Sequence, residues 1–172
     1  MSELIIKDNS IGLFKTEVEE IEDILLIEQN EENTPFIRQW SYDQHENAIS
    51  SPDYIHLTVK DLETEDLLGY VILIGATNTD LSLEFKRMVI TQKGKGLGKK
   101  TFCLVTKYAF ENLNMHRIWL EVMEHNKVGY NLYQSEGYKV EGTHRESCKI
   151  GDKFINLIVM SMLKEEYMKR HL

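Results

Sequence analysis

The 172 residues of this chain suit one domain with a buried core, and 42% hydrophobic with 28% charged residues is ordinary for a globular protein. A net charge of −8 argues against a nucleic-acid partner. The N-terminus lacks a signal-peptide pattern, and no apolar run approaches the ~18 residues of a membrane helix, so we expect a cytoplasmic protein without a membrane partner.

Hydrophobic periodicity and turn residues divide the first half of the chain into strands and two helices. Thr16 is a possible cap for the first helix, residues 33–35 break the pattern, and Ser41 is a favourable N-cap for the second helix. The expected elements are strands at 4–7 and 11–15, helices at 16–28 and 42–49, and strands at 54–60, 67–74 and 81–90.

The second half alternates helices and strands. A helix begins near Leu97, and a second one begins at Asn126 and ends before Gly137, a favourable residue just after a helix. The expected strands are 117–123, 138–143 and 154–163, and the tail at 164–172 is expected to be a short polar end. Short connections imply antiparallel pairs and the strand-helix-strand crossover implies a parallel pair, so the order predicts a mixed α/β sheet.

Residues 84–101 are the most informative stretch. An apolar strand is followed by Gly94, Gly96 and Gly98 and then by a helix, with lysines around the turn. Glycine permits close backbone approach, and a helix directs its positive end toward its N-terminus, so this loop suits a pyrophosphate. The Walker A and dinucleotide-binding spacings both fail here. A basic turn without a ligand is the alternative interpretation.

The segment Lys93-Gly94-Lys95-Gly96-Leu97-Gly98 fits the pattern (Gln/Arg)-x-x-Gly-x-(Gly/Ala) except at its first position. It resembles the acetyl-CoA pyrophosphate loop of the GNAT superfamily of N-acetyltransferases. The resemblance implies acetyl-CoA as co-substrate, and it implies cofactor contacts from Lys93, Gly94, Lys95, Gly96, Leu97, Gly98 and Lys99.

Residues 126–138 resemble a later GNAT motif, Asn-x-x-Ala-x-x-Leu-Tyr-x-x-x-Gly-Phe, with Gly129 in place of Ala and Tyr138 in place of Phe. The resemblance covers 67–163 well and the first 60 residues only by order of elements. It implies one domain over 1–172, with variable acceptor-side helices in 16–52 and a mixed, mostly antiparallel sheet of about seven strands and four helices. Within the superfamily, residues 84–85, 114–116 and 140–142 are similar to spermidine and ribosomal-protein-alanine acetyltransferases.

The resemblance also assigns roles in acyl transfer. Backbone N–H groups of Met88, Val89 and Ile90 are expected to bind pantetheine and the acetyl oxygen. Tyr133 is the expected general acid for the leaving thiolate, since a phenol with a pKa near ~10 is protonated at neutral pH. A core tyrosine is the alternative. Asn126 is expected to cap its helix, to bind the cofactor, or both.

A primary amine must lose a proton before it attacks, and Glu84 is the best candidate for the base, directly or through water. A solvated strand carboxylate is the alternative, and His116 and His125 are weaker candidates. For the acceptor we expect contacts from Trp40, Tyr42, His45 and Glu84, because aromatic rings and carboxylates suit an ammonium group. Packing of the helix on the sheet explains the aromatic residues equally well.

The sequence thus predicts an N-acetyltransferase that acts on a primary amine, namely a polyamine, a protein N-terminus or another small amine. The alternatives are a non-catalytic acyl-CoA-binding sensor or interaction module of the same fold, and a nucleotide-binding protein. Cys103 and Cys148 show no metal-type spacing, so no metal is expected. The oligomeric state stays open, with a homodimer as one option.

Overall fold

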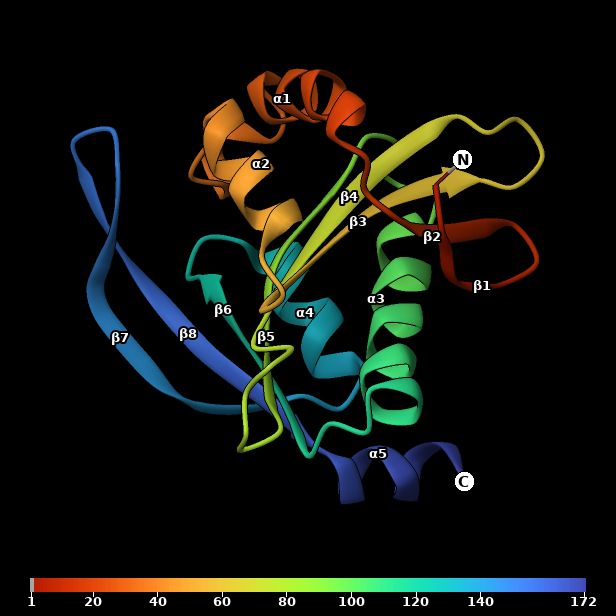
Figure 1. The fold of residues 1–172 in the computed structure, drawn as a ribbon. Helices are drawn as coiled ribbons and strands as arrows, with labels where there is room; N and C mark the ends of the chain where they lie inside the picture. The colour runs from red at the N-terminus through yellow and green to blue at the C-terminus, as the bar shows by residue number, and fades with distance from the viewer. Residues whose placement is uncertain (1) are drawn as a thin grey trace.

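The computed structural model describes residues 2–172, whose strands form one eight-stranded sheet in the order β1-β2-β3-β4-β5-β6-β8-β7 (Figure 1). The strands are β1 (Leu4–Lys7), β2 (Ile11–Lys15), β3 (Tyr54–Asp61), β4 (Leu67–Ile74), β5 (Ser82–Ile90), β6 (Arg117–Met123), β7 (Lys139–Ile150) and β8 (Lys153–Leu163). Among the strands of the described residues, only β5 and β6 pair in parallel. The mixed, mostly antiparallel architecture is therefore confirmed. All eight ranges expected to be strands join the sheet, one strand more than the family resemblance implied.

Five α-helices accompany the sheet: α1 (Ile21–Gln29), α2 (Tyr42–Ser50), α3 (Leu97–Lys107), α4 (Lys127–Ser135) and α5 (Lys164–His171). The expected polar tail is α5, which packs the ring of Tyr167 on Phe110 with centroids 4.9 Å apart. Ser41 caps α2 as predicted, by accepting from the Gln44 N–H. Thr16 does not cap α1, because its hydroxyl pairs with the imidazole of His56 instead.

The helices cover both faces of the sheet. Successive residues of β4 alternate between the faces, as strand geometry requires. Tyr70 and Ile72 pack with α1 residues such as Ile24, whereas Val71 and Leu73 belong to the larger core that includes Phe102 and Val105 of α3. Figure 1 shows α1 and α2 on one side of the sheet, α3 on the other, and the β7–β8 hairpin extending away from the rest. No helix within residues 2–172 is both long and apolar enough to cross a bilayer.

Strands β5 and β6 separate soon after they meet. Their register pairs only Ser82 with Arg117, Leu83 with Ile118 and Glu84 with Trp119. Both strands continue, β5 to Ile90 and β6 to Met123. The edge of β5 beyond Glu84 that faces β6 therefore has no partner strand among the described residues.

A β-bulge in β5 changes which side chains face α1 and α2. The register with β4 jumps between Arg87 and Phe85, so Lys86 is the extra residue. Phe85 and Met88 consequently belong to the α3-side core, whereas Arg87 lies on the α1 side, where it contacts Glu28.

Candidate functional site

A cavity of about 1020 Å³ fills the space where β5 and β6 diverge. Its walls come from β5 and β6, the glycine-rich loop before α3, the start of α4, residues 36–38, and the β7–β8 hairpin. Segments that lie far apart in the sequence therefore meet around one opening in the sheet.

The glycine-rich loop forms one end of this cavity. Gly94 has φ +75° and Gly96, the N-cap of α3, has φ +74°, a left-handed conformation that side chains disfavour. A Cβ at either position would meet no atom within 4 Å, so backbone conformation rather than space favours glycine there. No side chain caps α3 and its first turn holds no acidic residue, so its N-terminal N–H groups and positive dipole end suit a phosphate.

The lysines around the loop do not all take part. Lys93 and Lys99 line the cavity, and Lys99 also pairs with Glu136 at 3.2 Å. Lys95 lies outside the cavity lining, and its ammonium donates to the Gln92 side chain at 2.9 Å. The expected contact from the Lys95 side chain therefore has no support in the structure, whereas Gly94, Gly96, Leu97 and Gly98 all line the cavity.

The strand residues expected to bind pantetheine lie along the same opening. Met88, Val89 and Ile90 line the cavity and pair with β4 on their other side. Their cavity-facing edge has backbone groups free for a ligand, because the pairing with β6 ends at Glu84. This geometry suits hydrogen bonds to an extended amide chain.

Tyr133 lies on α4 and lines the cavity near the middle of the site. Its ring packs on Phe102, with centroids 4.8 Å apart, and more loosely on Phe85 at 6.5 Å. Burial raises the pKa of the Tyr133 hydroxyl to about 12, so the phenol keeps its proton at neutral pH.

Asn126 serves as the N-cap of α4, where its Oδ1 accepts from the Gly129 N–H at 2.9 Å. It also lines the cavity, so both expected roles remain compatible with its position. A Cβ on Gly129 would lie 2.8 Å from the Asn126 amide nitrogen. An alanine at position 129 would therefore require the Asn126 side chain to shift.

Two carboxylates occupy the part of the cavity where β5 and β6 first separate. Glu84 has a side chain only 16% exposed, and Lys86 is its ionic partner at 3.4 Å. Burial raises the pKa of Glu84, Lys86 opposes this rise, and the nearby charge of Glu121 adds to it. Glu121 also lines the cavity and pairs with His144 of β7 at 2.8 Å.

Glu121 was not predicted, although a signal for it was present. In β6 the buried residues Ile118, Leu120 and Val122 alternate with Trp119 and Glu121. A carboxylate on the opposite face of a strand beside the glycine-rich motif could therefore have been selected as a site residue.

The predicted acceptor contacts from Trp40, Tyr42 and His45 are corrected by the structure, because none of the three lines the cavity. His45 is fully buried and its Nε2 lies 3.1 Å from Glu28. Trp40 packs against Arg87 and Tyr54. The cavity wall from this region is instead formed by residues 36–38, just before Trp40.

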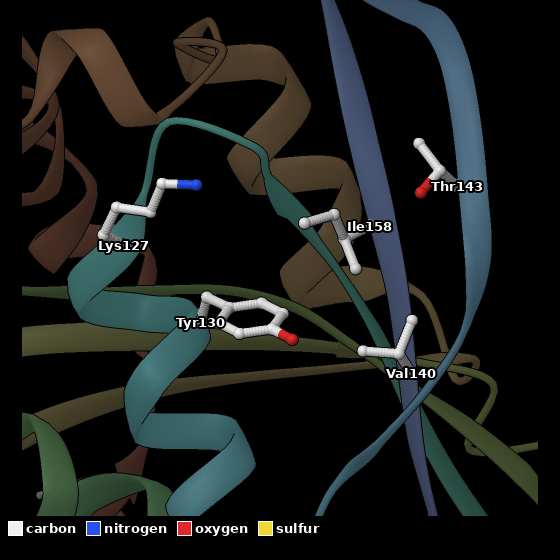
Figure 2. Close-up of a pocket in the computed structure, with 5 residues that line it drawn as sticks. All are labelled: Lys127, Tyr130, Val140, Thr143 and Ile158. Carbon is white, nitrogen blue, oxygen red and sulfur yellow. The ribbon is translucent and has the colours of Figure 1, made fainter.

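A smaller cavity of about 340 Å³ lies between α4 and the β7–β8 hairpin (Figure 2). It is lined by Lys127, Tyr130, Val140, Thr143 and Ile158. None of these is a predicted site residue, and the glycine-rich loop does not reach it. The larger cavity is therefore the candidate active site.

Comparison with known proteins agrees with this geometry. A family model described as an acetyltransferase (GNAT) domain matches residues 13–139. The chain is 24% identical over 161 residues to a spermidine N(1)-acetyltransferase of Escherichia coli K12, covering 88% of this chain and 87% of that protein. It is 28% identical over 127 residues to the Vibrio cholerae spermidine N(1)-acetyltransferase, covering 73% of this chain and 70% of that one.

Solved structures share the fold. The crystal structure of spermidine N-acetyltransferase from Vibrio cholerae in complex with CoA and spermine gives a TM-score of 0.83 at 24% identity, covering 94% of this chain and 99% of that one. A dodecameric structure of the same enzyme gives 0.82 at 24% identity, covering 96% and 100%. The family match over residues 13–139 shows that this chain belongs to the GNAT acetyltransferase family and uses acetyl-CoA as its acetyl donor.

Proposed function

We propose that this enzyme acetylates a primary amine of a flexible polycationic acceptor such as a polyamine, with residues 1–172 acting as one domain. The observation that carries the proposal is the cavity itself. One end has the features of a diphosphate and pantetheine site, and the other holds the carboxylates of Glu84 and Glu121. Two carboxylates suit an acceptor that carries more than one ammonium group. The names of the E. coli and V. cholerae relatives support the same class of acceptor.

The acceptor must lose a proton before it attacks, because an ammonium group has no lone pair. Glu84 is the proposed base, either directly or through a water. Its raised pKa makes it a stronger base than an ordinary carboxylate, while Lys86 helps to keep it ionised. The deprotonated nitrogen attacks the thioester carbonyl, so a C–N bond forms and the C–S bond then breaks.

The negative charges on the acetyl oxygen and on the leaving sulfur are stabilised by groups on β5 and α4. Backbone N–H groups of residues 88–90 are placed to stabilise the oxyanion that develops on the acetyl oxygen. Tyr133 is the proposed general acid that donates its proton to the leaving thiolate of coenzyme A. Burial keeps this phenol protonated at neutral pH, so it has a proton to donate to the departing sulfur. As the amide forms, its nitrogen gives up its second proton, which restores the Tyr133 phenol.

A thiol-release assay with acetyl-CoA tests the proposal. Spermidine and spermine should give the highest kcat/KM, well above a ribosomal-protein N-terminal peptide and above aminoglycosides. Binding of CoA without thiol release from any amine would indicate a non-catalytic module instead. Absence of heat on titration with CoA would refute the cofactor site.

We also infer that the reaction needs no metal. Acyl transfer by direct attack of an amine needs none. Dialysis against EDTA should therefore leave kcat unchanged.

Self-association into at least a homodimer is the proposed assembly. Strand β7 is an edge strand on which Val140 is 49% exposed, and Phe154 at the start of the adjacent β8 is 58% exposed. An exposed sheet edge with apolar side chains is a favourable surface for pairing with a second copy. Sedimentation analysis should therefore show a species of at least twice the chain mass of 20.1 kDa.

A further inference from the structure

Residues 35–40, called here the wall segment, are fastened at both ends. At one end the Pro35 carbonyl lies 2.9 Å from Nε2 of His125, and the Phe36 ring stacks on that imidazole with centroids 5.5 Å apart. At the other end the carbonyl of Arg38 accepts from Nη2 of Arg87. His125 precedes α4 and Arg87 lies on β5, so the wall segment bridges the two sides of the cavity.

The middle of the wall segment, residues 36–38, lines the cavity. Glu84, the proposed base, lines the same cavity, so the position of residues 36–38 sets part of the space in which an acceptor approaches it.

The contact at the Arg38 end of the wall segment depends on the buried carboxylate of Glu28, which is 1% exposed. Arg87 donates to it at 2.7 Å and the Tyr70 hydroxyl at 2.5 Å, while the Trp40 N–H donates at 2.8 Å. Burial alone would raise the pKa of Glu28, but hydrogen bonds from His45, Tyr70 and Trp40 hold it below the ordinary value. A buried charge with this many donors is fixed in position.

Two histidines extend the network from Glu28 to the Thr16 hydroxyl. Nε2 of His45 lies 3.1 Å from Glu28, its Nδ1 lies 3.0 Å from Nε2 of His56, and Nδ1 of His56 lies 2.8 Å from the Thr16 hydroxyl. Burial lowers the pKa of His56 to about 3, so that ring is neutral. Neutral His56 accepts from the Thr16 hydroxyl at Nδ1 and donates through Nε2 to Nδ1 of His45, which leaves Nε2–H of His45 to donate to Glu28. Each ring nitrogen of His45 and His56 has a partner within the protein, so these two side chains support the structure.

Arg87 connects this network to the wall segment through the shape of its guanidinium. Nη1 donates to Glu28, Nη2 donates to the Arg38 carbonyl, and the group lies 5.0 Å from the centre of the Trp40 ring. A planar fork can make both bonds and the stacking contact at once, whereas a lysine would supply one point charge. The bulge at Lys86 directs the Arg87 side chain toward α1.

We propose that Arg87 and Glu28 are positioning residues for the acceptor, which hold residues 36–38 at the distance from Glu84 that the acceptor requires. The proposal rests on the proposed function, because it assumes that the acceptor occupies this end of the cavity. Neither residue takes part in bond formation.

The test is the variant Arg87→Lys, which keeps a positive charge beside Glu28 but loses the planar guanidinium that makes both hydrogen bonds. We expect the acceptor KM to rise roughly ten-fold, the scale of one lost hydrogen bond to a charged group, while the CoA Kd stays within about two-fold. Hydrogen exchange should accelerate at the amides of residues 36–40 and stay unchanged in α3. Trp40→Leu, which removes the stacking partner, should shift KM and exchange in the same direction.

Arg117→Lys is the matched control, since Arg117 makes a forked pair with Glu141 on β7 and lies outside the cavity lining. Its KM, CoA Kd and exchange in residues 36–40 should equal those of the wild type. Equal KM values for Arg87→Lys and Arg117→Lys would overturn the proposal, as would a parallel loss of CoA affinity and thermal stability in Arg87→Lys. If the wild type acetylates no amine, the proposed function fails, and hydrogen exchange alone then decides whether Arg87 holds the wall segment.

Discussion

At the scale of single residues, the cavity places two titratable groups in environments that shift their pKa values in useful directions. Burial keeps Tyr133 protonated and makes Glu84 more basic. Both line the same cavity, one from α4 and the other from β5. An acid and a base held on separate elements around one cavity suit an acyl transfer between two substrates.

Replacing Tyr133 with phenylalanine should lower kcat roughly 10²-fold, the lower range for a general acid, with little change in KM. The ring contacts with Phe102 stay, so the melting temperature should change little. Tyr130→Phe, one turn earlier on α4, is the matched control and should keep full turnover. Steady-state thiol release measures both, and an unchanged kcat in Tyr133→Phe would eliminate its role as acid.

The pH profile tests Glu84. A base works only when ionised, and the folded-state pKa of this carboxyl is raised above 4.5, so kcat/KM should fall as pH drops through a midpoint above 4.5. Glu84→Gln should lower kcat/KM and flatten this acidic limb. A limb that persists unchanged in the variant would assign the base to another group.

At the scale of elements, the structure shows which parts of the chain could be predicted locally. The glycine-rich loop with α3, and Asn126 through Gly137, each carry their signal within a few residues, because caps and left-handed glycines are local requirements. Helix α5 was missed, since its one buried side chain, Tyr167, shows no periodicity. Its cap depends on Glu166 accepting from the Leu163 N–H, and its packing depends on the distant Phe110.

The conformation of Gly96 allows a direct test of the loop. A residue other than glycine at φ +74° costs about 1–2 kcal/mol, and a β-branched one costs more, so Gly96→Val should weaken CoA binding at least about ten-fold. Gly142→Val in β7 is the matched control, because that glycine has no positive φ and a Cβ there meets nothing within 4 Å. Calorimetric titration with CoA measures both. Equal affinities for the two variants would contradict the role of the Gly96 backbone.

At the scale of the whole molecule, contacts between residues far apart in the sequence could not be predicted from local patterns. Glu28 and Arg87 are 59 positions apart, and only the bulge at Lys86 brings the guanidinium to the α1 side. His45 and Trp40 were read as acceptor contacts because their aromatic and acidic neighbours in sequence suit a cation. In the fold, His45 contacts the buried Glu28, and the Trp40 ring packs on Arg87.

The ion pair between β6 and β7 predicts a pH dependence of global stability. Hydrogen bonds from Arg117, and then from Ser161, lower the pKa of Glu141 to about 2. A carboxyl with a depressed folded-state pKa stabilises the protein above its ordinary value of 4.5, and that contribution is lost as pH falls from 4.5 toward 2. The side chain is 41% exposed, so solvent reduces the contribution well below what the shift alone suggests.

Glu141→Gln should therefore lower the melting temperature at pH 7 and make it less sensitive to acid between pH 4.5 and 2.5. Glu63→Gln, in the exposed turn between β3 and β4, should follow the wild-type curve. Thermal melts across this pH range provide the comparison. Identical curves for Glu141→Gln and the wild type would show that the pair contributes nothing.

The three-residue register between β5 and β6 leaves the eight strands as two half-sheets with a narrow seam between them. A co-substrate bound in that seam contacts both half-sheets and so couples them to each other. We expect amides on either side of the seam to become more protected together when coenzyme A is bound. Product release would then require the two half-sheets to move apart, so the short pairing between β5 and β6 would influence the rate of turnover.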